Sequence, residues 1–227
     1  MKRIVNVARL QTINTRSIVW VPLVVLVAAF LVGLIIAAAA RGIPIYSGGV
    51  QAPLWYFLAL GIMTLARTFP FSQALGVTRR DFIAGTFMAA LALGAVLASV
   101  VVIGGWAEQA TNGWGVNLYF FHLPWLWSDG TFGAWLLSLA CAWTLFIAGF
   151  LLAGVYQRWG TLQLTLWLAG LGLALALAVL VIARMNAWAA LGQWFADTGA
   201  LGFALLLAAL GVVLGTASYG VVRRLQA

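Results

Sequence analysis

Charged residues are scarce in this chain, and several residue types on which enzymes rely are almost missing. Only 7% of the residues are charged, and the sequence has four acidic residues, one histidine (His122), one cysteine (Cys141) and one lysine (Lys2). A lone cysteine forms no internal disulfide, and we interpret Cys141 as a small residue within an apolar run. Because Lys2 is the only lysine, the sequence contains no phosphate-binding G-x-x-x-x-G-K-[ST] loop. If ATP drives this protein, another subunit binds the ATP.

The sequence also lacks the spacings that mark common catalytic and metal centres. It contains no H-E-x-x-H, no G-x-S-x-G and no pair of cysteines. His122 with Asp129 is the only candidate pair for an enzyme that acts on lipid, and an interfacial role for His122 is favoured over a metal site. We therefore expect no catalytic residue, metal or cofactor in this chain.

Apolar residues, in contrast, are abundant. They make up 65% of the chain, and the mean hydropathy is +1.08, as is typical of a protein that folds in lipid. A bilayer core roughly 30 Å thick is crossed by about 20 apolar residues. We predict an all-α polytopic membrane protein with transmembrane helices at about 18–40, 52–67, 82–106, 132–155, 161–183 and 199–222. The second segment is short, so we expect it to begin earlier or continue past Arg67.

The basic residues orient these six spans. Arg41 and Arg184 lie on one side, and the ten other basic residues lie on the opposite side, which is a strong positive-inside pattern. Both termini are therefore predicted to be cytoplasmic. Residues 1–17 would form an amphipathic or simply basic segment, 18–222 one transmembrane domain, and 223–227 a short tail. This pattern explains the net charge of +8 without nucleic-acid binding.

Aromatic residues gather in the two longest connections on the predicted outer side, at 107–131 and 185–198. Such amphipathic rings favour the headgroup region of a bilayer, so we expect membrane lipid as their partner, with a ligand platform as the alternative. In the second connection the rings lie near one helical face, which predicts a short helix at the outer interface. The interfacial tryptophans that we expect are Trp114, Trp125, Trp127, Trp188 and Trp194.

The predicted spans contain no Asp, Glu, Lys or His. A carrier driven by protons or sodium usually needs such a group near the middle of the membrane, where the ion is held and released. A transporter with this composition would therefore draw its work from a partner.

The most distinctive string in the sequence is FPFSQALGVTRRDFIAGT, at residues 69–86. It resembles a signature of the permease subunits of type-2 ABC exporters, in which the second span runs into a short cytoplasmic helix and then directly into the third span. The motif covers under a tenth of the chain, whereas the six-span plan of that family covers nearly all of it. The matching residues are Pro70, Ala74, Leu75, Gly76, Thr78, Arg79, Arg80, Phe82 and Gly85.

The resemblance implies a permease subunit of an ATP-driven exporter in a bacterial plasma membrane. The chain would form the substrate pathway with a second permease subunit, identical or homologous, and a separate ABC ATP-binding subunit would hold ATP and Mg²⁺. Two other hypotheses stay open on the residues alone. One is a noncatalytic membrane subunit that anchors or assembles a larger complex, and the other is a membrane enzyme that acts on lipid.

The local chemistry of residues 69–81 predicts a compact elbow. Gly76 suits a tight turn after a short helix, and Thr78 can cap the next helix with Asp81 at its third position. Such an elbow could seat in a groove of the ATPase, whereas a loop that only fixes the topology is the alternative. The residues expected to couple to the ATPase are Phe69, Pro70, Phe71, Gln73, Leu75, Gly76, Thr78, Arg79, Arg80 and Asp81.

Overall fold

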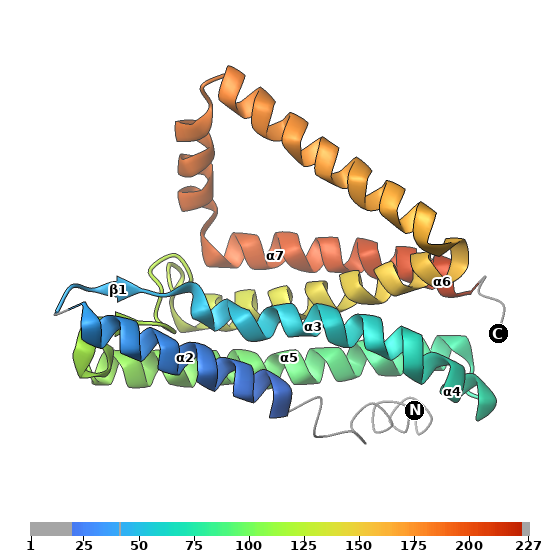
Figure 1. Ribbon diagram of the computed structural model, residues 1–227, viewed down its shortest axis with the longest axis horizontal. Coiled ribbons are helices and arrows are strands. Elements are labelled where there is room, and N and C mark those ends of the chain that lie inside the picture. Colours follow the sequence, from blue (N-terminus) through green and yellow to red (C-terminus); the bar gives the residue numbers. More distant parts are fainter. Residues whose placement is uncertain (1–19, 41, 224–227) are drawn as a thin grey trace.

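The computed structural model describes residues 20–40 and 42–223, and nearly all of this part of the chain is helical (Figure 1). The predicted segment 1–17 and nearly all of the tail 223–227 lie outside the described residues. Five continuous helical stretches are long and apolar enough to cross a membrane, and the longest of them is two helices joined at a bend. The prediction of a helical, multi-pass membrane protein is confirmed at this level.

The first three predicted spans correspond to three helical stretches. Helix α2 spans Val21–Ala39 and helix α5 spans Arg79–Ala110. Between them lies one 27-residue stretch, Gly48–Ala74. The second span therefore extends in both directions beyond its predicted bounds, as the thickness of a bilayer requires. The stretch consists of η2 (Gly48–Gln51), α3 (Ala52–Met63), the π-helical turn η3 (Thr64–Thr68) and α4 (Phe69–Ala74).

The last two helices, α6 (Gly130–Arg184) and α7 (Trp188–Val222), each bend at one glycine. Gly160 has φ 82° and ψ −176°, and Gly199 has φ 62° and ψ 178°. This combination is essentially restricted to glycine. The bends divide α6 into 130–159 and 161–184, and α7 into 188–198 and 200–222. These segments match the fourth, fifth and sixth predicted spans and the short helix predicted between the last two.

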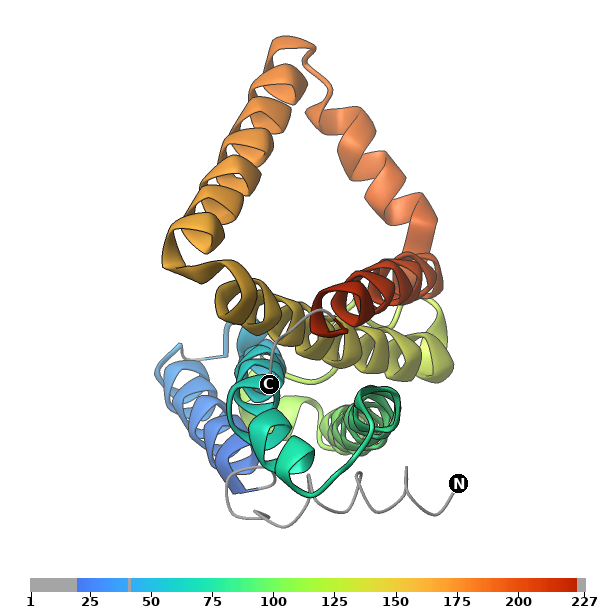
Figure 2. The ribbon, with the colours of Figure 1, turned by 90° about the vertical axis from the view of Figure 1, so that its right-hand side faces the viewer.

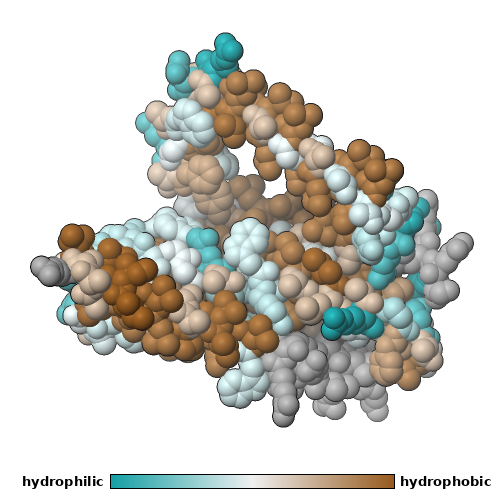
Figure 3. All heavy atoms as spheres, in the orientation of Figure 1, coloured by the Kyte–Doolittle hydropathy of each residue, from teal (hydrophilic) through white to brown (hydrophobic). Residues whose placement is uncertain are grey.

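The helices form a bundle with an arch on one side (Figures 1 and 2). Helices α2, α3 and α5, the first half of α6 and the last part of α7 run along one another. Residues 161–184 leave this bundle and residues 188–198 return to it; we call 161–198 the arch. Almost every residue of 161–184 is exposed. Apolar side chains cover much of the visible helix surface, and hydrophilic ones gather towards the helix ends (Figure 3), as expected for a protein surrounded by lipid.

Within the bundle, α3 and α6 approach each other through glycines. A Cβ atom on Gly61 would lie 2.0 Å from the carbonyl oxygen of Phe146, and one on Gly149 would lie 2.0 Å from the carbonyl oxygen of Leu58. Small residues of this kind allow helix backbones to touch in a membrane. Gly211 and Gly215 form a G-x-x-x-G pair in α7, and this pair also faces its own chain, because Gly211 packs against the ring of Trp143 and Gly215 lies next to the ring of Phe87.

The connections at one end of the bundle contain the strands of the described residues. Strand β1 (Ile45–Tyr46) pairs in parallel with strand β2 (Leu118–Tyr119), and the π-helical turn η4 (Gly113–Asn117) precedes β2. The rings of Tyr46 and Tyr119 stack at 5.0 Å. The purely helical prediction did not include this short pairing. We call this end of the bundle the aromatic end, and the opposite end, which carries Arg79, Arg80 and Arg158, the basic end.

Candidate functional site

The elbow, residues 69–81, lies at the basic end and consists of α4, the turn that follows it and the first residues of α5. Helix α4 ends in a Schellman motif, in which the N–H of Gly76 donates to the carbonyl of Gln73 (3.0 Å) and the N–H of Val77 donates to the carbonyl of Ser72 (3.1 Å). Gly76 has φ 71°, the left-handed conformation that this motif needs. Thr78 then caps α5, because its Oγ1 accepts the N–H of Asp81 at 3.2 Å. Both predicted turn elements are confirmed.

Aromatic rings fasten the elbow to the bundle. Phe69 is buried and meets the ring of Phe82 edge-on at 5.3 Å, and Phe82 in turn stacks on Phe150 of α6 at 6.4 Å. The hydroxyl of Ser72 donates to the carbonyl of Phe69 (2.7 Å), so this buried hydroxyl is satisfied within α4. Of the predicted coupling residues, Phe69 is therefore an internal anchor.

Other predicted coupling residues are exposed on the elbow. Phe71 is 56% exposed and Leu75 is 58% exposed. Arg80, later in the elbow, is also exposed, so the elbow presents both apolar and basic surface. Gln73 is half-buried, and its Nε2 donates to the carbonyl of Val77 (3.2 Å). Pro70, Gly76 and Thr78 are also exposed, and Asp81 is half-buried.

Arg79 connects the elbow to the last helix. Its Nη1 donates to the carbonyl of Arg223 at 2.8 Å and to the carbonyl of Val222 at 3.4 Å. These carbonyls belong to the end of α7, where a positive charge is favourable. The bonds join residues 143 and 144 positions apart in the chain. The guanidinium that we expected to contact a partner thus holds the C-terminal end of α7.

At the aromatic end, the connection at residues 107–131, which we call the outer loop, folds around one carboxylate. Glu108 lies near the end of α5 and is fully buried. Its Oε2 accepts the backbone N–H groups of Phe120 (2.8 Å) and Phe121 (3.0 Å), and its Oε1 accepts that of His122 (2.9 Å). The indole N–H of Trp114 also donates to Oε2 at 3.1 Å. Four charge-assisted bonds to one side chain make Glu108 the organising residue of this loop.

Sequence reasoning missed this role of Glu108. The available signal was an acidic residue at the end of an apolar helix, followed by a loop rich in rings and backbone N–H groups. A carboxylate in such surroundings is rarely buried without partners. The partners themselves lie 6 to 14 positions away, and no local pattern specifies them.

The predicted interfacial tryptophans fall into two groups. Trp125, Trp188 and Trp194 are about half exposed, at 54%, 54% and 49%. Trp114 and Trp127 are half-buried, and the indole N–H of Trp127 donates to the carbonyl of Phe121 (3.0 Å). The first group can contact lipid with its exposed surface, whereas the second group supports the outer loop from within.

His122 and Asp129, the candidate catalytic pair, have different partners. The ring of His122 is hydrogen-bonded to the side-chain amide of Gln109 and packs against Trp127 at 4.6 Å. Asp129 accepts the N–H of Leu201 at 2.8 Å through Oδ2. The described residues contain no group of three or more His, Cys, Asp or Glu that could hold a metal ion.

Asp129 and Ser128 together cap the final span. The N–H of Ala200 donates to Oγ of Ser128 at 3.0 Å, next to the bond between Leu201 and Asp129. These N–H groups belong to the first turn after the bend at Gly199, where a helix lacks internal acceptors. Two residues far away in the chain therefore supply the cap that the local sequence does not.

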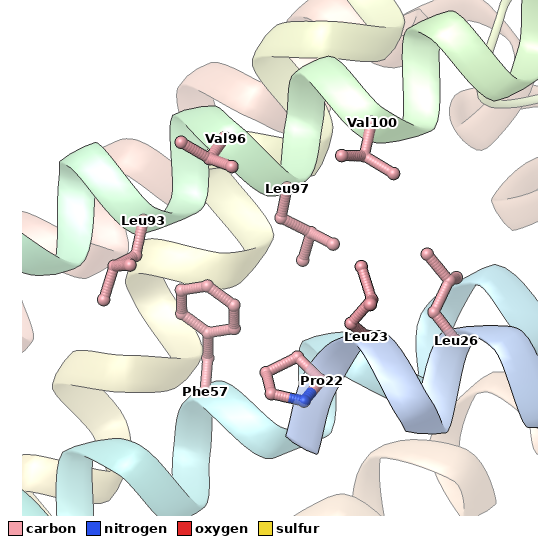
Figure 4. A pocket seen from close by; sticks show the side chains of 8 residues that line it. All are labelled: Pro22, Leu23, Leu26, Phe57, Leu93, Val96, Leu97 and Val100. Carbon is pink, nitrogen blue, oxygen red and sulfur yellow. The ribbon is translucent and has the colours of Figure 1, made fainter. Parts of the chain in front are cut away.

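Two cavities differ in size and surroundings. The first, between α2, α3 and α5, has a volume of about 90 Å³ and is lined only by apolar side chains, including Pro22, Phe57 and Leu97 (Figure 4). It is smaller than the roughly 300 to 1,000 Å³ of typical ligand pockets. The second lies beneath the arch at the aromatic end and has a volume of about 530 Å³.

No family model, curated protein or solved structure matches the chain in comparisons with known proteins.

Proposed function

We propose that the chain is the permease subunit of an ATP-driven exporter in a bacterial plasma membrane, coupled through the elbow to a separate ATP-binding subunit. The observation that carries the proposal is the elbow itself: a compact turn that presents Phe71, Leu75 and Arg80 while contacting three helices of the bundle. An exposed apolar pair beside a basic residue is typical of a protein interface. The resemblance of residues 69–86 to the exporter signature points to the same surface.

The elbow connects to the bundle in a way that suits force transmission. Thr78 joins it to α5, Phe69 joins it to α6 through Phe82 and Phe150, and Arg79 joins it to the end of α7. A displacement of the elbow by a partner would therefore move three helices together. In this proposal a second permease subunit completes the substrate pathway, and ATP and Mg²⁺ stay on the partner.

Affinity purification of the tagged chain from its native membranes tests the proposal. We expect an ATPase with a nucleotide-binding loop to copurify, and we expect Arg80→Glu and Phe71→Ala each to weaken that association by about tenfold, the effect of losing about 1.4 kcal/mol. Arg80 is the better probe than Arg79, since Arg79→Glu would also break the contact with α7. The matched control is Arg158→Glu, a basic residue at the same end that stacks on its neighbour Trp159.

Two results would contradict the proposal. One is a stable partner that hydrolyses no nucleotide, which would favour the hypothesis that the chain is an anchoring subunit of a larger complex. The other is an ATPase whose binding and turnover are unchanged by both elbow variants. The hypothesis of an enzyme that acts on lipid makes a different prediction. A lipid product should form with the natural chain and should not form with His122→Ala.

A further inference from the structure

We infer that the cavity beneath the arch binds the apolar tail of a single-chain amphiphile, with its headgroup at the aromatic end. The inference does not depend on the proposed ATPase. The cavity has a volume of about 530 Å³, and the space-filling view shows the hollow beneath the arch (Figure 3). Three parts of the chain form its walls, namely the end of the outer loop, the first half of α6, and the return of the arch into α7. The lining residues used below are Trp125, Ser128, Cys141, Phe195, Ala196 and Phe203.

The chemistry of the walls selects an apolar occupant. Apart from Ser128 and Cys141, the lining side chains are apolar or aromatic, or glycine. The hydroxyl of Ser128 is already occupied, because it accepts the N–H of Ala200 and is bonded to the carbonyl of Trp125 (3.3 Å). A ligand buried here therefore finds few polar partners. At about 30 Å³ for a small group such as water, the volume holds roughly 18 groups of that size, comparable with one long acyl chain.

Specific contacts hold the cavity in shape. The rings of Phe195 and Phe203 stack at 4.9 Å across the bend between the arch and α7. The cap from Ser128 and Asp129 fixes the other side of that bend. At Gly199 a Cβ atom would lie 2.5 Å from Oδ2 of Asp129, so only glycine permits this close approach. A site that is ordered before binding loses less entropy when it is filled.

The mouth of the cavity indicates which headgroups fit. Trp125 lines the cavity and is 54% exposed, as suits a ring in the headgroup region. The charged residues adjacent in sequence to the lining residues are Asp129, next to Ser128, and Asp197, next to Ala196; both are acidic. Like charges repel, so we expect uncharged, zwitterionic or cationic headgroups to bind better than a carboxylate.

The chain carries its own reporter for this test. Cys141 is the single cysteine of the sequence and lines the cavity. The rate at which a small maleimide modifies Cys141 can be measured on the full chain in lipid nanodiscs, with lysophosphatidylcholine as the added probe. We expect labelling to slow by about tenfold when the probe reaches ten times its dissociation constant. Palmitate at the same concentration should protect Cys141 less.

Two variants of the same helix separate cavity filling from general perturbation. Ala196→Trp fills the cavity, so labelling should be slow with or without the probe, and native mass spectrometry should show no bound lysolipid. Ala190→Trp adds the same ring outside the lining and should retain protection and one bound lysolipid. The inference is overturned if the probe leaves the labelling rate of the natural chain unchanged while the protein purified without probe carries no stoichiometric acyl-chain species, or if Ala196→Trp still binds lysolipid. Equal protection by palmitate would overturn the headgroup preference.

A membrane lipid and a free amphiphile present the same kind of tail, and a lipid extract distinguishes these sources. A stoichiometric acyl-chain species in the protein purified without added probe identifies a resident lipid. An empty extract together with protection by the added probe identifies a free amphiphile. Failure of the labelling test while the ATPase still copurifies would refute the cavity inference alone.

Discussion

The elbow at the basic end and the outer loop at the aromatic end are both compact, but they are built differently. In the elbow, the turn-forming bonds join residues three to five positions apart, as in the bond from Val77 to Ser72 and the cap from Thr78 to Asp81. In the outer loop, the decisive bonds reach from Glu108 to residues as far as 14 positions away. Ser128 and Asp129 reach residues 72 positions away.

This difference decides how each region responds to mutation. A local turn loses one bond when one residue changes, and neighbouring bonds survive. A loop folded around one carboxylate loses all its central bonds at once, because a single side chain accepts them. The stability variants below are expected to range from the largest effect, at the outer loop, to the smallest, at the elbow.

Glu108→Ala should have the largest effect. It leaves four N–H groups without their acceptor, and at about 1 kcal/mol or more for each buried donor the free energy of unfolding should fall by on the order of 4 kcal/mol. Thermal unfolding of the purified protein measures this loss. Asp197→Ala, which removes an exposed acid from the same end, is the control and should change little. A Glu108→Ala protein with natural stability would refute the organising role of this carboxylate.

Asp129→Ala should have the next largest effect. It removes one of the two caps on the final span, which costs about 1 to 2 kcal/mol for a helix cap. Hydrogen exchange should increase at the first turn after Gly199, while the elbow keeps its protection. Asp129→Asn retains an acceptor and should lose less. Unchanged exchange at Leu201 in Asp129→Ala would contradict the cap.

Gly76→Ala tests the elbow. The left-handed conformation with φ 71° costs a residue with a Cβ about 1 to 2 kcal/mol. A Cβ atom at Gly76 would meet nothing within 4 Å, so the loss reports backbone conformation and not a clash. Gly170 is also free of neighbours within 4 Å but lies inside a regular helix. Gly170→Ala should therefore be neutral or slightly stabilising, and equal melting temperatures for the two variants would count against the Schellman turn.

Thr78→Ala should have the smallest effect, about 1 kcal/mol or less for the loss of an exposed cap. Thr78→Ser keeps the hydroxyl and should retain natural stability. Differential scanning fluorimetry on both variants checks the pair. If Thr78→Ala weakens the outer loop as strongly as Glu108→Ala does, the two ends are coupled and the comparison fails.

Much of the fold was predictable because lipid imposes simple requirements on length and polarity. The bounds expected for the fifth span, 161–183, agree closely with the helix after Gly160. The second span is longer than predicted at both ends, as its short predicted length implied. The bends were not predictable, because Gly160 and Gly199 are two of 25 glycines. The β1–β2 pairing was missed because two residues per strand carry no usable periodicity.

The candidate site was predictable in its turns and not in its contacts. Gly76 and Thr78 were identified correctly, since a left-handed turn and a helix cap depend on residue type and spacing. Arg79 was expected to face a partner, and the structure places its guanidinium on the end of α7. That bond links residues more than 140 positions apart, and no local pattern contains it.

The amino-acid sequence by itself determined that this chain folds as a set of helices long and apolar enough to cross a membrane, where its elbow turns, and which end of the bundle is basic. Span length, turn conformation and the position of basic residues each depend on a short stretch of sequence. A short stretch is therefore enough to predict them. Only the tertiary structure decided that Glu108 organises the outer loop, that Ser128 and Asp129 cap a distant helix, and that a cavity lies beneath the arch. Each of these depends on a donor and an acceptor, or two apolar faces, that meet only after the helices have packed.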